Sequence, residues 1–548
     1  MEQLIAPYGT SGRLINLIAE PHRAELLRHE ALQLPSLELD WQQICALELL
    51  MNGAYSPLDA YMTRAQCEKV IQTQALDDGT YWPVPITLTS KRAPVAKAGE
   101  RIALRDGEGF MLAILTVSEQ WLDEAGLTCY GGTVEGVALP AHADFAALRL
   151  TPAALRSQFI KRGWHKVVAW QARQPIHRAQ FEFCLKSAIE NQSNLLLHPL
   201  AGGDLVESPA YFGLIRSFLA VRNRFPAAST QLALLPSLQR PATPQDLMLR
   251  AIIARNYGCT ALIAGGEAEP EGECRRGEDL VKASLTSFAN RMAEIGMQLI
   301  AYPRMVYVED RGEHMPESEV PRGARVRTLT SEEFDRRMQR GLRIPDWYSF
   351  PEVIAELQRN SPPRTQQGMT IFFTGLSGAG KSTLARALSA RLMEMGGRTV
   401  TLLDGDIVRR HLSSELGFNK AHRDINVRRI GFVASEITKH RGIAICAPIA
   451  PYRETRRDVR AMVEAVGGFI EIYVATPIET CETRDRKGLY AKARAGLIPE
   501  FTGVSDPYEV PEHPELAIDT TNLGIEEAIR QILQKMELEG YLRDATAN

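Results

Sequence analysis

The sequence predicts an α/β protein of several domains: a mostly β domain first, then a parallel α/β domain with a small helical cap, and a further α/β domain at the C-terminal end. Three observations support this. The chain has 548 residues, which is too long for a single hydrophobic core. Strand-like runs alternate with amphipathic helical segments through its middle. A polar segment with two prolines, RNSPPRTQQGM (359–369), then interrupts all periodicity.

The composition limits the classes of partner. Hydrophobic residues make up 45% of the chain and charged residues 24%, and the formal net charge of −3 gives no general attraction to nucleic acid or to a membrane surface. No apolar run approaches the roughly 20 residues of a membrane-spanning helix, and the first residues lack a signal-peptide pattern. The eight cysteines are scattered without a CxxC pair, as expected for reduced thiols in a cytoplasmic protein. We therefore expect small-molecule substrates and no nucleic-acid or membrane partner.

The first domain is expected over residues 1–150, where short β-type runs such as TYWPVPITLTS (80–90) and GFMLAILTVSE (109–119) lie between turns. In the second domain, residues 151–358, strand-like runs alternate with helical patterns, which predicts a parallel sheet. These runs are HKVVAWQAR (165–173), SNLLLHPLAG (193–202), STQLALLPS (229–237) and CTALIAGG (259–266).

The helical cap of the second domain is predicted from Thr330 and Glu333, which have capping-box spacing ahead of FDRRMQRGL. The polar segment that follows has no periodicity, so residues 359–368 are expected to form a linker. Residues 369–548 then form the third domain.

The strongest motif is TIFFTGLSGAGKSTLARAL (370–388), in which an apolar strand runs into a glycine-rich loop and a helical pattern follows at once. This is the spacing of a phosphate loop, in the structural context that such a loop requires. The glycines let backbone N–H groups turn inward around phosphates, Lys381 would reach the β- and γ-phosphates, and Ser382 would ligate Mg²⁺. The predicted positions for binding ATP and Mg²⁺ are Gly375, Ser377, Gly378, Ala379, Gly380, Lys381, Ser382 and Thr383.

Residues downstream indicate what receives the phosphoryl group. The run TVTLLDGD (399–406) ends in Asp404 and Asp406, and carboxylates at a strand end suit metal positioning and orientation of an acceptor hydroxyl. The runs DGDIVR, FNKAHRDIN, PYR, KGLY and FTG follow in that order. In combination they resemble the adenylylsulfate (APS) kinase family, which phosphorylates the 3′-hydroxyl of APS to give PAPS. The resemblance covers essentially all of residues 369–540.

This resemblance implies a P-loop NTPase fold, with a parallel sheet flanked by helices. It also implies that Lys381, Asp404 and Asp406 are catalytic, with Asp406 orienting or deprotonating the 3′-hydroxyl. A dianionic, adenine-bearing acceptor needs clustered cations and aromatic faces, which agrees with the residues present. The implied phosphosulfate ligands are Arg409, Arg423, Asn426 and Lys487, the implied adenine sandwich is Phe418 and Phe501, and the other implied APS-binding positions are Pro451, Tyr452, Gly488, Leu489 and Thr502. The segment 487–503 is expected to be a lid that excludes water.

One position departs from that family. Many bacterial members have a serine immediately before the Pro-Tyr pair, where this chain has Ala450. Because alanine cannot carry a phosphate, we expect direct in-line transfer. Four further arginines are explained as well by solvated charges on a helix face as by ligands, and are left out of the site: Arg428, Arg429, Arg456 and Arg457.

Residues 1–350 resemble ATP sulfurylase (sulfate adenylyltransferase), which makes APS from ATP and sulfate. The runs that carry this resemblance are LLMNGAYSPLDAYM (49–62), WPVPITL (82–88), QARQPIHRAQFE (171–182), LLLHPLAG (195–202), RNYGCTALIAGG (255–266), MVYVED (305–310) and IPDWYSFPEV (344–353). The resemblance implies a PUA-like β domain and a Rossmann-like, nucleotidyltransferase-type domain. Fusions of a sulfurylase and a kinase in this order are often hexameric, so a homo-oligomer is expected.

Several catalytic groups of the sulfurylase family are replaced. Its Q-T-R-N-P-x-H-x-x-H pattern has two histidines that share one helix face and can donate to phosphate oxygens, but the second is Gln180 here. Its G-R-D-H-A-G-P run is GGEAEP (265–270), without the arginine or the histidine. Since losing one such donor costs about 10²–10³ in rate, we expect little or no sulfurylase activity. The degenerate site comprises Gln171, Arg173, His177, Gln180 and His198.

Two alternatives to a kinase with an inactive N-terminal half stay open. A fully bifunctional PAPS synthase would require that the sulfurylase site tolerates these replacements. A binding module would resemble fungal relatives of this domain order, in which the kinase-like domain is inactive and senses PAPS. The intact phosphate loop with Lys381 and both aspartates argues against the binding module.

Overall fold

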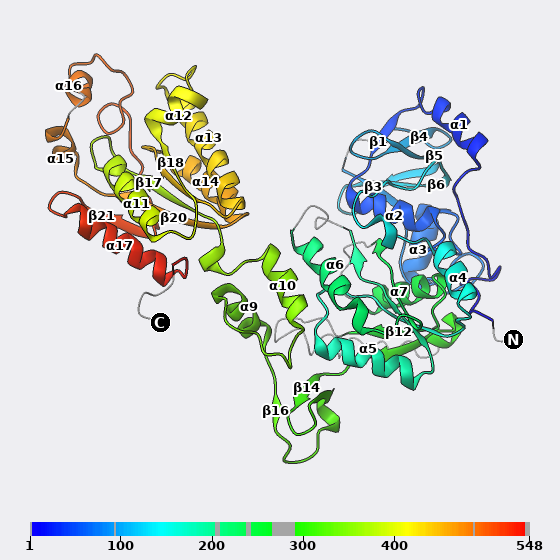
Figure 1. Ribbon diagram of the computed structural model, residues 1–548. Helices are drawn as coiled ribbons and strands as arrows, with labels where there is room; N and C mark the ends of the chain where they lie inside the picture. The colour runs from blue at the N-terminus through cyan, green and yellow to red at the C-terminus, as the bar shows by residue number, and fades with distance from the viewer. Residues whose placement is uncertain are drawn as a thin grey trace. The chain divides into compact units, whose positions relative to one another are not determined.

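The computed structural model of the chain describes residues 3–91, 95–202, 209–236, 243–265, 291–485 and 488–542, without the side chains of Pro209 and Asp406. The chain divides into two compact units: residues 1–335 with 344–360, and residues 336–343 with 361–548 (Figure 1). The division after residue 360 falls inside the polar segment that was expected to be a linker, where a short 3-10 helix, Arg364–Gln366, also occurs.

The first unit begins with a β-rich domain. Its six-stranded sheet has the order β1, β4, β5, β6, β2, with β3 also pairing with β6. The strands are β1 (Ser36–Glu38), β2 (Ala60–Tyr61), β3 (Leu88–Ser90), β4 (Arg101–Arg105), β5 (Met111–Leu122) and β6 (Thr128–Gly136), and the helices are α1 (Pro21–Glu30), α2 (Trp41–Met51) and α3 (Arg64–Thr73). Capping boxes begin α2 at Asp40 and α3 at Thr63. The predicted mostly β domain with some helix is confirmed.

A parallel five-stranded sheet forms the centre of the next domain, with the order β10, β8, β7, β12, β13. Its strands are β7 (Val167–Trp170), β8 (Asn194–Leu197), β10 (Thr230–Leu232), β12 (Ala261–Ala264) and β13 (Gln298–Ala301), and its helices are α4 (Pro152–Lys161), α5 (Arg178–Glu190), α6 (Pro209–Val221) and α7 (Pro244–Asn256). The strand order reverses between β7 and β12, and ligands of such sheets bind beyond the carboxyl ends of the strands at the point of reversal. This is the predicted Rossmann-like arrangement.

Smaller elements complete the first unit. Thr330 Oγ1 accepts a hydrogen bond from Glu333 N at 3.2 Å, so the helix predicted for the small helical cap begins at the predicted residue. The small antiparallel sheet of β14 to β16 was not predicted. These elements are β9 (Leu200–Ala201), β11 (Leu235–Pro236), β14 (Met305–Val308), β15 (Glu313–Pro316), β16 (Val326–Arg327), α9 (Ser331–Arg340, whose later residues group with the second unit) and α10 (Pro351–Asn360).

The second unit is a parallel five-stranded sheet, of order β18, β19, β17, β20, β21, between two layers of helices (Figure 1). Phe373 of the central strand belongs to one apolar cluster with α11 and α17, and Phe372 belongs to another with α13 and α14. The strands are β17 (Met369–Thr374), β18 (Val400–Asp404), β19 (Ile443–Ala447), β20 (Gly468–Val474) and β21 (Leu516–Ile518). The helices are α11 (Lys381–Met395), α12 (Gly405–Leu412), α13 (Lys420–Lys439), α14 (Arg453–Glu464), α15 (Ile478–Thr483), α16 (Leu489–Arg494) and α17 (Ile525–Leu538). The predicted sheet flanked by helices is confirmed.

Two further observations concern the chain as a whole. Within the ranges given above, no helix combines the length and the apolar character that a bilayer span demands. The cysteines in those ranges are buried and form no disulfide.

Candidate functional site

The phosphate loop connects β17, the central strand, to α11. Gly375, Gly378 and Gly380 have φ angles of 145°, 77° and 109°, in the region that favours glycine. A Cβ at Gly375 would lie 2.6 Å from the carbonyl oxygen of Val474, and a Cβ at Gly378 would lie 3.0 Å from that of Cys481. Backbone conformation and close contact therefore both require glycine at the first two of these positions.

Side chains from neighbouring segments hold the loop from outside. The hydroxyls of Thr476 and Thr520 donate to the carbonyl oxygen of Ala379 at 3.1 and 2.9 Å. The hydroxyl of Tyr490 donates to the carbonyl oxygen of Ser377 at 2.8 Å. These bonds fix the shape of the loop, and such preorganisation is what phosphoryl-transfer sites depend on.

Lys381 is buried at the start of α11. Its ammonium group donates to the carbonyl oxygens of Gly375 and Leu376 at 2.9 and 2.7 Å. Burial lowers the pKa of Lys381 from 10.5 to about 8, although the negative charge of Asp404 opposes this shift. Asp404 ends β18 and accepts a hydrogen bond from Arg386 at 3.2 Å.

Oxygen ligands of the kind that Mg²⁺ prefers are present beside the loop. Ser382 lies on the first turn of α11 and offers a hydroxyl, and Asp404 offers a carboxylate at the end of β18. This donor set fits Mg²⁺ bound together with nucleotide phosphates. Asp406 lies in α12, but its side chain is outside the described atoms, and Lys487 lies outside the described residues.

Three of the predicted APS-binding residues meet around one guanidinium group. Arg423, which is 8% exposed, donates to Thr502 Oγ1 at 2.6 Å and to the Tyr452 hydroxyl at 2.8 Å. Asp506 was not predicted, yet its carboxylate lies 2.9 Å from Arg423 and accepts from the Tyr452 hydroxyl at 2.7 Å. The one signal in the sequence was an aspartate four residues after Thr502 in a segment already assigned to the acceptor site.

Two buried polar atoms on α13 have no hydrogen-bond partner among the described residues: Nε of Arg423 and Oδ1 of Asn426. A buried polar atom without a partner costs about 1–3 kcal/mol. The two residues are three positions apart and so share one helix face. A donor and an acceptor that the protein leaves unpaired are available to a ligand.

The two predicted adenine-binding rings have different surroundings. Phe418 is 68% exposed, and the guanidinium carbon of Arg409 lies 4.3 Å from its ring centroid. Arg409 also donates to the carbonyl oxygens of Leu416 and Gly417 at 3.2 and 3.0 Å. Phe501 is partly buried and meets the ring of Tyr490 edge to face at 5.1 Å. That the two rings sandwich an adenine stays a prediction.

The remaining predicted positions lie near these groups in the chain. Gly488 precedes α16 with a φ of 64°, and Leu489 is the first residue of that helix. The carboxylate of Asp485 accepts from Leu489 N at 2.8 Å and so caps the helix. Pro451 is buried, and its carbonyl oxygen accepts from Glu509 N at 2.9 Å.

Arg456 fits neither explanation considered for it, a solvated charge on a helix face or a ligand-binding residue. It is only 4% exposed, so it is not a solvated charge. Its guanidinium donates to the carbonyl oxygens of Ala450 and Glu509, each at 2.7 Å, and lies 3.1 Å from the carboxylate of Glu471. Arg456 therefore links the segments that contain Ala450, Glu471 and Glu509. By contrast, Arg457 is largely exposed.

In the first unit, three residues of the predicted sulfurylase site, Gln171, His177 and Gln180, form hydrogen bonds within the protein. Arg250 donates to the side-chain and backbone oxygens of Gln171 at 3.0 and 2.7 Å. Nδ1 of His177 lies 2.8 Å from Ser349 Oγ, and burial lowers the pKa of this imidazole to about 4. Gln180, in place of the second histidine, accepts from His177 N at 3.2 Å and so caps α5.

Of the predicted residues of this half, His198 is buried and neutral, and Arg173 is a cation. His198 is fully buried after β8, its ring lies 4.7 Å from that of Tyr257, and burial lowers its pKa to about 3. Arg173 is partly buried in the segment after β7. Residues 266–270, which replace the second family run, lie outside the described residues. Both histidines are therefore neutral at pH 7.

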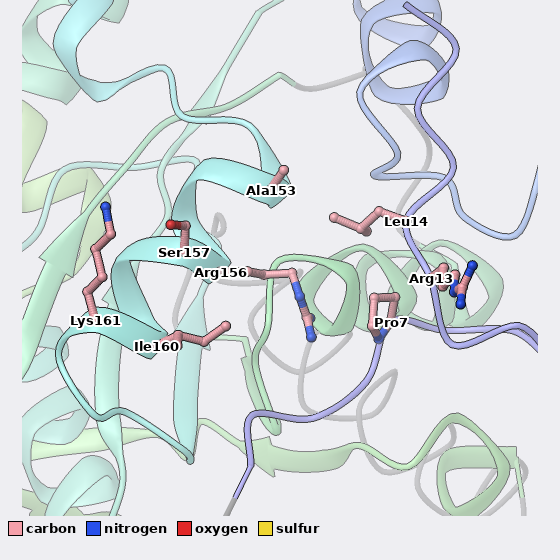
Figure 2. Close-up of a pocket in the computed structure, with 8 residues that line it drawn as sticks. All are labelled: Pro7, Arg13, Leu14, Ala153, Arg156, Ser157, Ile160 and Lys161. Carbon is pink, nitrogen blue, oxygen red and sulfur yellow. The ribbon is translucent and has the colours of Figure 1, made fainter.

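A surface hollow of about 500 Å³ lies elsewhere in the first unit, between the N-terminal segment and α4. Figure 2 shows that Arg13 and Lys161 point away from each other, and Arg156 donates to the backbone oxygen of Arg255 at 3.2 Å. These cations do not converge on a point where a phosphate could bind. The lining residues are Pro7, Arg13, Leu14, Ala153, Arg156, Ser157, Ile160 and Lys161, and they include no predicted site residue.

Comparisons with known proteins agree with both resemblances. Family models match a PUA-like domain at residues 5–130, ATP-sulfurylase at 146–360 and adenylylsulphate kinase at 367–519. The sulfate adenylyltransferases of Phaeosphaeria nodorum and Emericella nidulans are each 39% identical to the chain, over 98% of it and 99% of their own length. A solved structure described as a hexameric APS kinase from Thiobacillus denitrificans is 63% identical, covers 99% of both chains and has a TM-score of 0.86.

Proposed function

Because the chain belongs to the family of sulfate adenylyltransferases that carry a C-terminal adenylylsulphate kinase domain, we propose that its second unit phosphorylates the 3′-hydroxyl of APS with MgATP. The observation that carries the proposal is the pairing of a complete phosphate loop with unpartnered buried atoms on Arg423 and Asn426. A loop suited to the phosphoryl donor ATP and buried polar atoms suited to the acceptor APS are thus present in one compact unit.

In the proposed reaction, the 3′-oxygen of APS attacks the γ-phosphorus, the bond to the β–γ bridging oxygen breaks, and ADP leaves with the bridging oxygen. Lys381 and the loop N–H groups would bind the β- and γ-phosphates, and Asp406 would accept the proton of the 3′-hydroxyl. Mg²⁺, held by Ser382 and Asp404 with the phosphates, would neutralise charge on the transferring group. Transfer is direct, since Ala450 offers no hydroxyl for a phosphoenzyme.

The acceptor would bind through charge and stacking. Arg423, which Asp506 and Tyr452 hold in place, would donate from Nε to the phosphosulfate, and Asn426 would accept from a donor on APS. The exposed ring of Phe418, with Arg409 stacked against it, suits one face of the adenine.

We further propose that the N-terminal half has little or no sulfurylase activity. The two histidines of its predicted site, His177 and His198, are buried and neutral, and Ser349 already engages the imidazole of His177. Buried neutral side chains are poorly suited to stabilise charge on a leaving pyrophosphate. A bifunctional PAPS synthase is the second candidate, favoured by 39% identity to proteins named sulfate adenylyltransferase.

One pair of assays on a single preparation tests these proposals. Conversion of APS and MgATP to PAPS and ADP measures the kinase, and pyrophosphate-dependent formation of ATP from APS measures the sulfurylase in reverse. We expect the first activity and only background in the second. Clear turnover in both would establish the bifunctional enzyme. PAPS binding without kinase turnover would show a binding module instead.

We also propose a homo-oligomer, because the similar protein from Thiobacillus denitrificans is described as hexameric. Light scattering on the purified chain tests this directly. A mass equal to that of the 60.9 kDa chain would exclude it.

A further inference from the structure

We propose that His422 is a positioning residue whose imidazole holds the loop that presents Phe418, so that the Michaelis constant for APS rises when the imidazole is removed. The inference rests on the proposed kinase function and names a determinant of acceptor binding outside the predicted site. It concerns the turn between α12 and α13.

Both backbone polar groups of Gly417 are hydrogen-bonded to side chains. Its N–H donates to Nδ1 of His422 at 2.8 Å. Its carbonyl oxygen accepts from Arg409 at 3.0 Å. Asn419, the N-cap of α13, accepts from His422 N at 2.8 Å, which anchors His422 on the first turn of the helix. The turn is therefore fixed to α13 through one imidazole and one backbone cap.

Phe418 directly follows this clamped peptide. Its ring is 68% exposed, so packing against the protein gives it little support other than the guanidinium of Arg409. The direction of the ring consequently depends on the backbone of Gly417. If the bond from Gly417 to His422 is lost, the N–H of Gly417 loses its acceptor, and the ring loses its preorganised position. An adenine that stacks on it then binds more weakly.

The hydrogen bond from Gly417 to His422, which we call the clasp, requires an acceptor atom on the side chain of residue 422. In the imidazole the acceptor is the lone pair of Nδ1, with the ring proton on Nε2. An amide oxygen placed near Nδ1 could accept the same N–H, whereas an alanine side chain could not.

The test is the Michaelis constant for APS at saturating MgATP and one pH. His422→Ala should raise this constant about fivefold, with kcat at saturating APS little changed, since a net hydrogen bond of about 1 kcal/mol corresponds to about a fivefold change. His422→Asn places an amide oxygen near the position of Nδ1 and should keep a constant close to that of the wild type.

His440→Ala is the matched control, because His440 lies at the exposed C-terminal end of the same helix. It should keep the wild-type Michaelis constant for APS. A wild-type constant in His422→Ala would overturn the proposal, as would a constant raised equally in His422→Asn and His422→Ala.

A second measurement does not depend on turnover. Hydrogen exchange of the peptide spanning residues 413–419, compared at one pH, should show one amide less protected in His422→Ala than in the wild type. Equal protection would overturn the clasp. If the wild type fails to phosphorylate APS while this amide is protected, the proposed kinase function fails and the clasp stands.

Discussion

The two parallel sheets place their candidate site residues in the same kind of location but in different chemical states. In both units these residues follow the carboxyl ends of the strands. In the second unit, a buried lysine faces the loop carbonyls and Arg423 keeps an unpartnered Nε. In the first unit, His177 and His198 are buried, and burial lowers the pKa of both. The second unit places a buried cation and unpartnered polar atoms in its candidate site, whereas in the first unit Ser349 holds His177, and His198 is buried with neither ring nitrogen hydrogen-bonded to a described residue.

This difference lies in the surroundings of the motif residues. His177 survives from the sulfurylase pattern, but Ser349 occupies its Nδ1 and two aromatic rings, Phe334 and Tyr348, lie against it. Gln180 has become a helix cap. The surroundings, not the residue identity, decide whether an imidazole can take part in chemistry.

The largest expected effect is at Lys381. Lys381→Ala should lower kcat for phosphorylation of APS by about 10³-fold or more, because an electrostatic contact to the transferring phosphoryl group is removed. The measurement is steady-state ADP formation, with a melting curve to show that the unit is folded. Lys439→Ala, an exposed lysine at the end of α13, is the control and should be fully active. Retained turnover in Lys381→Ala would place the chemistry elsewhere.

A smaller loss is expected from Asp506→Asn. The carboxylate is the counter-charge of a buried guanidinium, and removing one partner of a buried ion pair is strongly unfavourable. We expect kcat/KM for APS to fall about 10²-fold, which corresponds to about 2.7 kcal/mol, with KM for ATP changed less than about twofold. Asp458→Asn breaks an exposed ion pair with Arg428 and should have no such effect. Equal losses for both substrates would mean that Asp506 only stabilises the fold.

Local signals made the phosphate loop, the strand-end Asp404 and the cap at Thr330 predictable from the sequence, since each depends on neighbours within one turn or one strand. Asp506 and Arg456 were not predictable in the same way. Tyr452 and Asp506 are 54 residues apart, and only the folded chain shows that a buried cation between them needs a carboxylate. The burial of Arg456 also depends on strand β20, whose Glu471 neutralises it. Long-range charge pairing leaves no periodic pattern in a sequence.

The affinity for ATP should depend on pH, but should change by less than tenfold per pH unit. Burial places the pKa of free Lys381 at about 8, and bound phosphates favour the charged ammonium. Affinity for ATP is therefore full below pH 8 and falls as the pH rises above it. Titration with a fluorescent ATP analogue at pH 7, 8 and 9 measures this. A Lys381→Arg variant, whose guanidinium does not titrate in this range, should show constant affinity. Constant affinity in the wild type would contradict a lowered pKa.

The smallest effect on kinase activity is expected from His177→Ala, which tests the comparison through a residue of the first unit. The imidazole lies in the first unit, where it contacts Ser349 and aromatic rings, so its loss should destabilise that unit by about 1–3 kcal/mol. Turnover of APS by the second unit should change less than about twofold. Melting curves and kinase kinetics on one preparation separate the two outcomes. A large fall in kinase turnover would show that the sulfurylase-like half takes part in the reaction, and an unchanged melting curve would show that His177 is not the packing residue that its contacts indicate.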